Sequence, residues 1–450
     1  MQINLERVGF AMLKRKAYEY LRNWKETKRK ECLLIKGARQ VGKTYLVEHF
    51  AQQNYGHFVE VDFLKNPQAT GAFEGSLEVD DIVARLSLYY PEAAFEAGDT
   101  LLFLDEIQEC PKARTALKPL AIDGRYDVMA SGSLLGLHYG QDPGLKEEIP
   151  SVPVGYERQL VMHSLDFEEF LWAFGIGQDT IDYLKGFFDN RLQVPESVNE
   201  KMHEYLRQYA VVGGMPEAVS VFLERHSYAA VQEVQEKILS SIEDDIARHS
   251  RGSEKVKIRK CWNSIPAQLA KENRKFQYSK VEAKGTSRKF GDSIQWLSDA
   301  SLVNLCINVA APSFPLRAYE KEGYFKTYVN DTGLLVAMYG YEMKRAILEK
   351  TLKGPAKGGI YENLVADLLV KSGYALHYYK PDENDQEIEF LLDTSPQPLP
   401  VEVKARNGAT RSLDEFMKVF HPAIAYKLVD GNVGYTEPKL TLPHYMAMFL

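Results

Sequence analysis

Residues 37–44 read GARQVGKT and hold two glycines, a lysine and a threonine at the spacing G-x-x-x-x-G-K-[ST]. In this pattern the backbone N–H groups of a tight loop surround phosphate oxygens, the lysine contacts them as a point charge, and the hydroxyl is a ligand for magnesium. Glycine permits the required backbone path. We predict that the following residues bind the phosphates of a nucleotide: Gly37, Ala38, Arg39, Gln40, Val41, Gly42, Lys43, Thr44 and Tyr45.

Two adjacent acids, Asp105 and Glu106, follow the apolar run 101–104, LLFL. The run is typical of a buried parallel strand, and ligands of open α/β sheets bind at the carboxyl ends of such strands. We predict that Asp105 and Thr44 hold magnesium and that Glu106 orients or deprotonates the water that attacks the γ-phosphate. The alternative is that both acids only cap a helix that begins at Ile107.

Short apolar runs predict the strands that carry these residues, at 32–36, 57–63, 101–104, 126–131 and 159–163. Helical spacing of apolar residues predicts helices at 17–24, 44–52 and 166–173. The strand at 126–131 ends in Ser131-Gly132-Ser133, where a hydroxyl could sense the γ-phosphate or where the small residues could simply form a turn. The helix at 17–24 could line the adenine pocket or belong only to the core.

The length of 450 residues suggests about three domains, and a hydrophobic content of 45% is ordinary for a globular protein. A net charge of −7 argues against a uniformly basic surface for nucleic acid but leaves local patches open. The four cysteines form no C-x-x-C pair, so we expect reduced packing residues in a cytoplasmic protein. No apolar run reaches 18 residues, and we expect neither export nor a membrane span.

The middle of the chain is predicted to be helical from Ile176 to His249, and the sequence 213–217, GGMPE, marks either a helix corner or a nucleotide contact. Residues 253–309 follow the order helix, short helix, longer helix and strand of a winged helix-turn-helix. Lys280, Lys284, Arg288 and Lys289 lie near its third helix and could contact DNA phosphates. Winged helices also bind proteins, so a protein partner stays open.

The last part of the chain is predicted to fold in the order αβββαβ, with the helix at 360–372 and strands at 377–380, 388–392 and 399–404. This order, with the sequence Glu402-Val403-Lys404, resembles the PD-(D/E)XK nuclease fold. Alternation along a strand places Glu402 and Lys404 on one face, beside Glu389 of the neighbouring strand. Glu389 and Glu402 could bind a metal for cleavage of a nucleic acid, with Lys404 as the third catalytic residue. Glutamate replaces the usual aspartate at 389, so a catalytically silent domain is the alternative.

Five motifs, GARQVGKT, LFLDEIQ, ASGSLLG, DFEEFLWA and GGMPEAV, resemble those of a prokaryotic AAA+ type ATPase family with a C-terminal domain of unassigned function. The resemblance implies that Ser131 or Ser133 is the sensor and that an arginine contacts the γ-phosphate. Arg158 lies where the family has a Gly-Arg pair, although this chain reads GYER. Further arginines that could serve are Arg39, Arg114, Arg125 and Arg248.

We therefore expect an α/β protein with an AAA-like P-loop NTPase core at 1–175, a helical lid at 176–250, a winged helix at 251–335 and an α/β restriction-endonuclease-like domain at 336–450. The expected function is ATP hydrolysis with Mg²⁺, coupled to DNA through the C-terminal domains. The alternative is a nucleotide-gated switch that binds protein partners. We expect no membrane partner and leave a homo-oligomer open.

Overall fold

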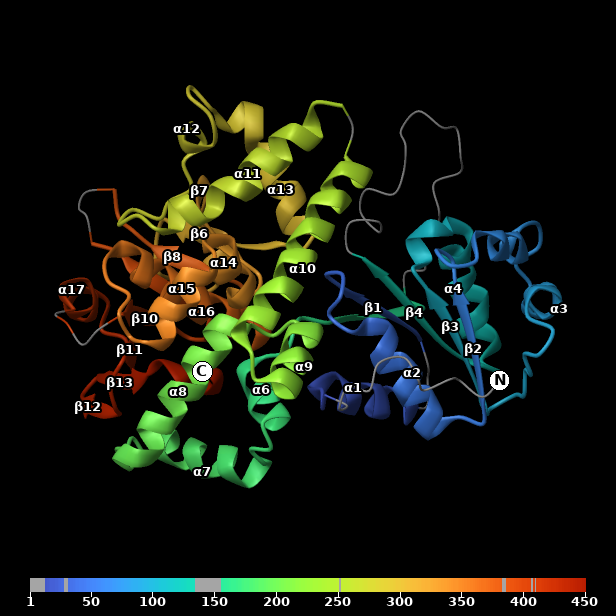
Figure 1. Cartoon of the computed structure of the whole chain (residues 1–450), viewed down its shortest axis with the longest axis horizontal. Coiled ribbons are helices and arrows are strands. Elements are labelled where there is room, and N and C mark those ends of the chain that lie inside the picture. Colours follow the sequence, from blue (N-terminus) through green and yellow to red (C-terminus); the bar gives the residue numbers. More distant parts are fainter. Residues whose placement is uncertain are drawn as a thin grey trace. The chain divides into compact units, whose positions relative to one another are not determined.

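The computed structural model describes residues 13–27, 31–133, 155–250, 252–382, 386–405, 408 and 410–450 (Figure 1). The chain divides into two compact units, Met1–His163 and Ser164–Leu450. Three residues of the ASGSLLG motif, 134–136, and the first twelve residues of the chain lie outside the described ranges. Among the described residues, no helix combines the length and the apolar character that crossing a bilayer requires.

The first unit contains a five-stranded sheet in the order β2-β3-β4-β1-β5, in which all paired strands are parallel. Its strands are β1 (Cys32–Gly37), β2 (His57–Asp62), β3 (Thr100–Asp105), β4 (Asp127–Ser133) and β5 (Glu157–Val161). All five predicted strands are therefore present, and β5 begins two residues earlier than the expected Gln159. Because β4 lies between β1 and β3, its carboxyl end neighbours both the end of β1, which leads into the phosphate loop, and the end of β3 at Asp105.

Helices cover both faces of this sheet (Figure 1). Alternate strand residues point to opposite faces, so Leu33 and Ile35 pack with α1 and α2, whereas Leu34 packs with α3 and α4. The helical elements are α1 (Lys16–Lys25), α2 (Lys43–Asn54), η1 (Pro67–Phe73), α3 (Val79–Tyr89), η2 (Ile107–Glu109) and α4 (Pro111–Asp123). Burial on both faces explains why the strands read as continuous apolar runs.

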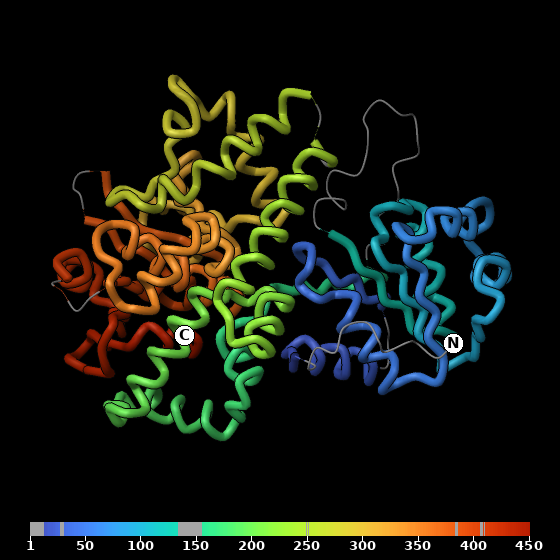
Figure 2. The backbone as a smooth tube through the Cα atoms, in the orientation of Figure 1, coloured from blue at the N-terminus to red at the C-terminus, as the bar shows by residue number. Residues whose placement is uncertain are grey.

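The second unit begins with a helical region, as predicted for 176–249. Its helices are α6 (Phe167–Ala173), α7 (Gln178–Asp189), α8 (Glu196–Val212), α9 (Pro216–Arg225) and α10 (Tyr228–His249). The expected ATPase boundary at residue 175 would place α6 in the first unit, but the chain divides at His163. Figure 2 traces this region in green and the C-terminal residues of the same unit in red.

The GGMPE segment is a helix corner packed against the turn that precedes α14 (Thr332–Tyr339). A Cβ on Gly213 would lie 2.2 Å from an oxygen of Asp331, and a Cβ on Gly333 would lie 2.5 Å from the Gly213 nitrogen. Asp331 accepts hydrogen bonds from the N–H of Gly214, at 2.8 Å, and from the Ser164 hydroxyl, at 2.9 Å. Close backbone approach inside this unit therefore accounts for the glycines.

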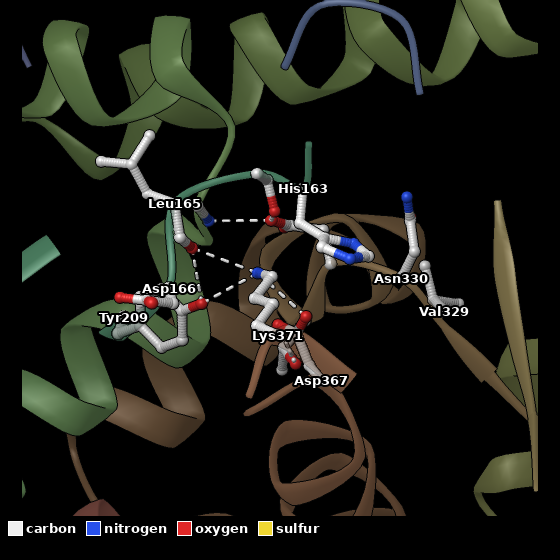
Figure 3. Close-up of polar contacts among 12 residues, drawn as sticks. His163, Leu165, Asp166, Tyr209, Val329, Asn330, Asp367 and Lys371 are labelled. Carbon is white, nitrogen blue, oxygen red and sulfur yellow. Dashed lines mark hydrogen bonds and ion pairs between the residues drawn. The ribbon is translucent and has the colours of Figure 1, made fainter. Parts of the chain in front are cut away.

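A buried lysine reinforces the same region (Figure 3). Lys371 donates to the carbonyl of Leu165 at 3.1 Å and to the hydroxyl of Tyr209 at 3.0 Å, and it forms an ion pair with Asp367 at 2.9 Å. Tyr209 in turn donates to the Leu165 carbonyl at 2.8 Å. These bonds hold the segment at Leu165 against α8 and against α16 (Pro355–Lys371) of its own unit.

The remaining strands form one eight-stranded mixed sheet in the order β12-β13-β11-β10-β9-β8-β6-β7. Its strands are β6 (Val303–Val309), β7 (Glu320–Val329), β8 (His377–Tyr379), β9 (Ile388–Leu392), β10 (Leu399–Lys404), β11 (Ala425–Val429), β12 (Gly434–Thr436) and β13 (Lys439–Pro443). The remaining helical elements are α11 (Glu254–Leu269), α12 (Tyr278–Val281), α13 (Ser287–Asp299), η3 (Leu316–Tyr319), α15 (Tyr341–Leu348), α16 (Pro355–Lys371), α17 (Arg411–Phe420) and η4 (His444–Phe449).

The predicted element orders of the C-terminal half are present in this unit. Elements α11, α12, α13 and β6 follow one another as expected, and β6 pairs with β7 as an antiparallel hairpin. The order α16-β8-β9-β10-α17-β11 is the predicted αβββαβ. However, β6 also pairs with β8, so a single sheet crosses the expected domain border at 335/336.

Candidate functional site

The phosphate-loop residues lie between the carboxyl end of β1 and the first turn of α2. Gln40 and Gly42 have positive φ angles of 63° and 91°, and a Cβ on Gly37 would lie 2.2 Å from the Met162 carbonyl oxygen. Lys43 crosses the loop, because its Nζ donates to the carbonyls of Gly37 at 3.1 Å and Ala38 at 2.9 Å. The loop thus opens the amino end of α2, where N–H groups and the helix dipole favour anions.

Lys43 is buried, with 6% of its surface exposed. Burial lowers the pKa of Lys43, and the carboxylates of Glu106 and Asp105 oppose that decrease. A poorly solvated cation interacts strongly with a nearby anion because little water screens the pair. The lysine is consequently placed to contact negatively charged oxygens at the loop.

Asp105 joins the loop to the centre of the sheet. Thr44 Oγ1 donates to Asp105 Oδ2 at 2.8 Å, and the Ser131 hydroxyl donates to Asp105 Oδ1. Burial raises the pKa of Asp105, the two hydroxyls lower it, and the charges of Glu106 and Asp62 raise it further. Thr44 of α2 and Ser131 of β4 therefore meet at the carboxylate of Asp105, at the end of β3.

Glu106 has a left-handed backbone, with φ of 53° and ψ of 47°. For a residue other than glycine this conformation costs on the order of 1–3 kcal/mol, and such strain is concentrated at functional sites. Glu106 is the residue before η2, but its side chain makes no capping hydrogen bond there. It instead accepts a 2.5 Å hydrogen bond from Gln108 Nε2. The helix-capping alternative for Glu106 is therefore absent from the structure.

The comparisons with known proteins agree with this geometry. Residues 29–171 match the family described as AAA domain. After this match we refer to residues 29–171 as the AAA-like ATPase domain. Residues 203–345 and 357–443 match two families described as domains of unknown function, DUF8612 and DUF4143. No curated protein sequence matches the chain.

Several solved structures show a weak similarity to this chain. The Walker-type ATPase paby2304 of Pyrococcus abyssi is 13% identical, with 73% of this chain and 96% of that chain covered and a TM-score of 0.43. The Orc1 protein of Aeropyrum pernix in complex with DNA is 13% identical, with 75% and 92% covered and a TM-score of 0.29. AMPPCP-bound DnaA from Aquifex aeolicus is 13% identical, with 64% and 89% covered and a TM-score of 0.28. Likenesses this weak carry no conclusion about activity.

The structure places Arg158 away from the phosphate loop of its own unit. Arg158 pairs in register with Leu33, near the start of β1, whereas the phosphate loop follows the end of that strand. At about 3.3 Å per residue, the four residues from Leu33 to Gly37 separate them by roughly 13 Å. Arg158 Nε also forms a 2.9 Å ion pair with Glu31. Within its own unit, Arg158 therefore lies at the wrong end of the strand to contact a γ-phosphate.

The other candidate arginines of the first unit differ in whether they lie near the phosphate loop. Arg114 is paired with Glu157 at 3.2 Å, and Arg125 is paired with Asp80 and Asp123 at 2.6 and 2.9 Å. Arg39 lies on the phosphate loop, and its charge contributes to lowering the pKa of Lys43, for which burial is the main cause. Of the three arginines that the sequence offered in this unit besides Arg158, Arg39 is thus the one that lies on the loop.

Arg15 is a residue of the first unit that contacts the phosphate loop and that the motifs did not identify. Its guanidinium donates to the carbonyl of Val41, in the phosphate loop, at 2.9 Å and to the carbonyl of His163 at 2.6 Å. These partners are 26 and 148 residues away in sequence. Because both are backbone carbonyls, no sequence pattern at either partner could have indicated them.

The three nuclease-like residues do come together in the second unit. Lys404 Nζ lies 3.3 Å from Glu389 Oε1 and 2.7 Å from Glu402 Oε1. Burial raises the pKa of Glu389 to about 7, with Lys404 opposing the increase and Glu362 and Glu402 adding to it. The predicted convergence of β9 and β10 residues on one face is confirmed.

Further buried charged residues lie beside these three, and nothing in the sequence indicated that they would be neighbours. Glu362 of α16 lies 2.8 Å from Lys326 and 2.7 Å from Arg274, and it also accepts a hydrogen bond from Tyr328. Lys326 is fully buried and also pairs with Glu387 at 2.5 Å. The helical position of Glu362 was noticed in the sequence, but its cationic partners come from other elements.

This cluster does not fit the metal that a nuclease would need. Ammonium and guanidinium groups lie against its carboxylates, so cations of the protein already neutralise most of the acids. Within the described ranges, the groups of three ligands close enough to share an ion are His57-Glu96-Asp99 and Glu60-Asp62-Asp105. Neither group includes Glu389 or Glu402. The predicted role of these two residues as metal ligands is therefore not supported by the geometry.

Proposed function

We propose that the ATPase domain binds ATP with magnesium and hydrolyses it by attack of water on the γ-phosphate. The observation that carries this proposal is the 2.8 Å hydrogen bond between Thr44 and Asp105. It joins the residue after the phosphate-binding lysine to the acid at the end of β3. Phosphoryl transfer depends chiefly on positioning and charge stabilisation, and this junction brings the required groups together.

The donors at this junction fit magnesium. Mg²⁺ prefers oxygen ligands and retains several waters, and a threonine hydroxyl beside a carboxylate supplies oxygens of that kind. Asp62 and Glu60 lie close enough to Asp105 for all three carboxylates to share one ion. When bound, magnesium would neutralise charge on the terminal phosphates. Thr44 and Asp105 would hold it.

The remaining roles fall to residues around the same junction. Lys43 contacts the β- and γ-phosphate oxygens, and Arg39 adds a second positive charge on the loop. Glu106 accepts a proton from the attacking water or orients it, and Gln108 holds the carboxylate of Glu106 in place. Ser131 keeps Asp105 oriented and ionised through its hydrogen bond. Glu106 makes no side-chain capping bond at the start of η2, so its carboxylate is bonded to the side chain of Gln108 and not to a backbone N–H of that helix.

ATP hydrolysis by the purified chain tests the proposal. We expect Lys43→Ala to reduce the rate by at least about 100-fold, because the transferred phosphoryl group loses its buried cation. Lys118→Ala is the control, because Lys118 is an exposed lysine of α4. Wild-type turnover in the Lys43→Ala variant would disprove the assignment, as would equal effects of the two substitutions.

A second proposal concerns DNA, which the positive start of α13 favours. Lys280, Lys284 and Arg288 are exposed there, while Phe290 and Ile294 bury the opposite side of the helix. Two neighbouring cations are already partly neutralised, because Lys260 and Lys289 share Glu282. We propose that α11, α12, α13 and the β6–β7 hairpin act as a winged helix whose α13 contacts phosphates. Nucleotide hydrolysis would then control DNA binding.

Salt dependence separates this proposal from a switch that binds only proteins. Each phosphate contact steepens the fall of DNA affinity with salt by about 0.9 in the logarithmic slope. We expect Lys284→Gln with Arg288→Gln to reduce the slope by roughly two, and Lys255→Gln, an exposed lysine of α11, to leave it unchanged. Absence of DNA binding at low salt would favour the nucleotide-gated switch with a protein partner.

For the C-terminal domain we propose a nuclease-like fold that has kept structure and binding without cleavage. The neutralised cluster around Glu362, Glu389 and Glu402 supports this, since the protein supplies its own cations. We therefore expect no plasmid cleavage in manganese by the wild-type chain. Cleavage that disappears in Glu402→Ala would overturn this proposal and restore the metal role.

A further inference from the structure

Three carboxylates gather near the carboxyl ends of β2 and β3, on the face of the sheet that α2 covers. Asp62 and Asp105 are register partners at the ends of these two strands. Glu60 lies two residues before Asp62, so both side chains point to the same face. That face is the one on which Phe58 of β2 and Phe103 of β3 pack with α2. Oxygen atoms of the three acids lie within 4.8 Å of one another, so the group attracts a cation.

The turn that follows β2 holds a lysine beside two of these acids. Asp62 Oδ1 accepts hydrogen bonds from the N–H of Leu64 at 2.9 Å and from that of Lys65 at 2.8 Å, so the side chain of Asp62 fixes the turn. Lys65 Nζ lies 2.7 Å from Asp62 Oδ2 and 3.4 Å from Glu60 Oε1. Burial lowers the pKa of Lys65, but the two carboxylates raise it overall, so the lysine is charged at pH 7.

The third acid has partners of another kind. Asp105 accepts hydrogen bonds from the hydroxyls of Thr44 and Ser131, which are neutral groups. Its charge therefore stays available to a metal ion, whereas Lys65 balances the charge of its neighbours. Burial is the main cause that raises the pKa of Asp105, and the charge of Asp62 adds to the increase. The charges of the two acids are thus coupled.

The lysine decides how strongly this corner of the sheet attracts a divalent ion. Mg²⁺ and Mn²⁺ prefer oxygen ligands, and three carboxylates within reach of one another are a set of that kind. The ammonium group of Lys65 repels a divalent ion that approaches Asp62 or Glu60, because few ångströms separate the charges. With the lysine in place, an ion at Asp105 must obtain further oxygens from another source. The phosphates of a nucleotide are such a source.

We propose that Lys65 is a positioning residue of the magnesium site, which balances Glu60 and Asp62 so that a divalent ion is held at Thr44 and Asp105 only together with a nucleotide. This inference rests on the ATP site proposed above at the phosphate loop. Lys65 in this way makes metal binding depend on the nucleotide.

Binding of Mn²⁺ to the nucleotide-free full chain tests the proposal, with the free ion measured by electron paramagnetic resonance. Lys65→Met should bind Mn²⁺ at least about tenfold more tightly than wild type, because three carboxylates lose their cation. Asp62→Asn in the Lys65→Met background should return the affinity to within about threefold of wild type, since it restores the local net charge. Lys118→Met, at an exposed lysine of α4, should change it less than about twofold.

Two results would overturn the proposal. One is an equal Mn²⁺ affinity of Lys65→Met and Lys118→Met, and the other is tight binding by Lys65→Met that Asp62→Asn does not reverse. The side chain of Lys65 is 57% exposed, so we expect the variant to fold, and circular dichroism checks this. Lys65→Gln is a second variant that also removes the charge, and it should give the same increase.

The outcome is separate from that of the hydrolysis assay, because these titrations contain no nucleotide. Wild-type turnover in Lys43→Ala would disprove the proposed ATPase site and leave the Mn²⁺ result standing. The group His57-Glu96-Asp99 is unchanged in every variant, so any ion that it binds contributes equally to all of them.

Discussion

The hydroxyl of Thr44 lies 2.8 Å from Oδ2 of Asp105, although 61 residues separate them in the chain. Thr44 belongs to the first turn of α2, which follows β1, and Asp105 lies at the end of β3. Strand β4 runs between β1 and β3 in the sheet. This junction assembles the proposed magnesium ligands, with the second oxygen of Asp105 held by Ser131. Substitutions at this junction and among the buried charges of both units should therefore have measurable effects.

Glu106→Gln should separate nucleotide binding from turnover. The amide cannot accept a proton from water, so the rate of ATP hydrolysis should fall at least about 100-fold. ATP affinity should change less than about threefold, because Lys43 and the loop amides remain. Steady-state hydrolysis and binding of a fluorescent ATP analogue measure the two effects. The control is Glu109→Gln, an exposed acid three residues on; loss of binding in Glu106→Gln would contradict the assigned role.

Ser131→Ala should shift the pH dependence of hydrolysis. The Ser131 hydrogen bond lowers the pKa of Asp105 against the increase caused by burial, so its removal should raise that pKa. A carboxyl group with a higher pKa ionises at higher pH, so the acidic limb of the pH–rate profile should shift to higher pH. We also expect a decrease in rate of about tenfold. Ser133→Ala decides between the two serines, and a larger shift in that variant would make Ser133 the important one.

Arg15→Gln should weaken ATP binding through the loop. Its guanidinium donates to the Val41 carbonyl at 2.9 Å, and glutamine is too short to keep that bond while also reaching His163. Loss of a charged hydrogen bond costs about 1.5–3 kcal/mol, so the dissociation constant should rise roughly tenfold or more. Arg22→Gln is matched to it, because Arg22 lies in α1, the helix that begins directly after Arg15, and its side chain is 56% exposed. Equal affinities of the two variants would show that Arg15 does not support the loop.

Lys326→Met should destabilise the second unit strongly. The substitution leaves Glu362 and Glu387 without their shared buried cation, and breaking a buried pair in this way costs about 3–5 kcal/mol. Urea unfolding should show this loss, and Lys326→Met with Glu362→Gln should recover part of it. Lys321→Met on the same strand, whose partner Asp382 is exposed, should cost less than about 1 kcal/mol. A small effect of Lys326→Met would mean that water reaches the cluster.

Lys344 should make stability rise with pH. Burial lowers its pKa to about 7 from 10.5, so between these values the unfolded chain binds more protons than the folded one. The free energy of unfolding must then increase with pH across that window, by at most about 1.4 kcal/mol per unit. Urea unfolding at about pH 7.5 and 9.5 should show a smaller increase in Lys344→Met than in wild type. Lys237→Met, an exposed lysine of α10, should retain the wild-type slope.

Local pattern determined a large part of what was predicted for this protein. The phosphate loop is contiguous in sequence, and the runs 32–36 and 101–104 are apolar because helices cover both faces of their strands. The element order of the C-terminal half also follows from periodicity, since each helix and strand must present an apolar face. The start of α16 was missed by five residues, although Gly354-Pro355 is a helix-start signal.

Tertiary structure alone decided which charged groups meet. Arg158 was placed by motif position, yet strand register puts it beside Leu33, away from the loop, because register depends on pairing across the sheet. Arg15 contacts backbone carbonyls, which have no sequence signature. Lys326 and Arg274 neutralise Glu362 only because distant strands and helices pack together, so the sequence could name the acids but could not say whether a metal or the protein's own cations balance them.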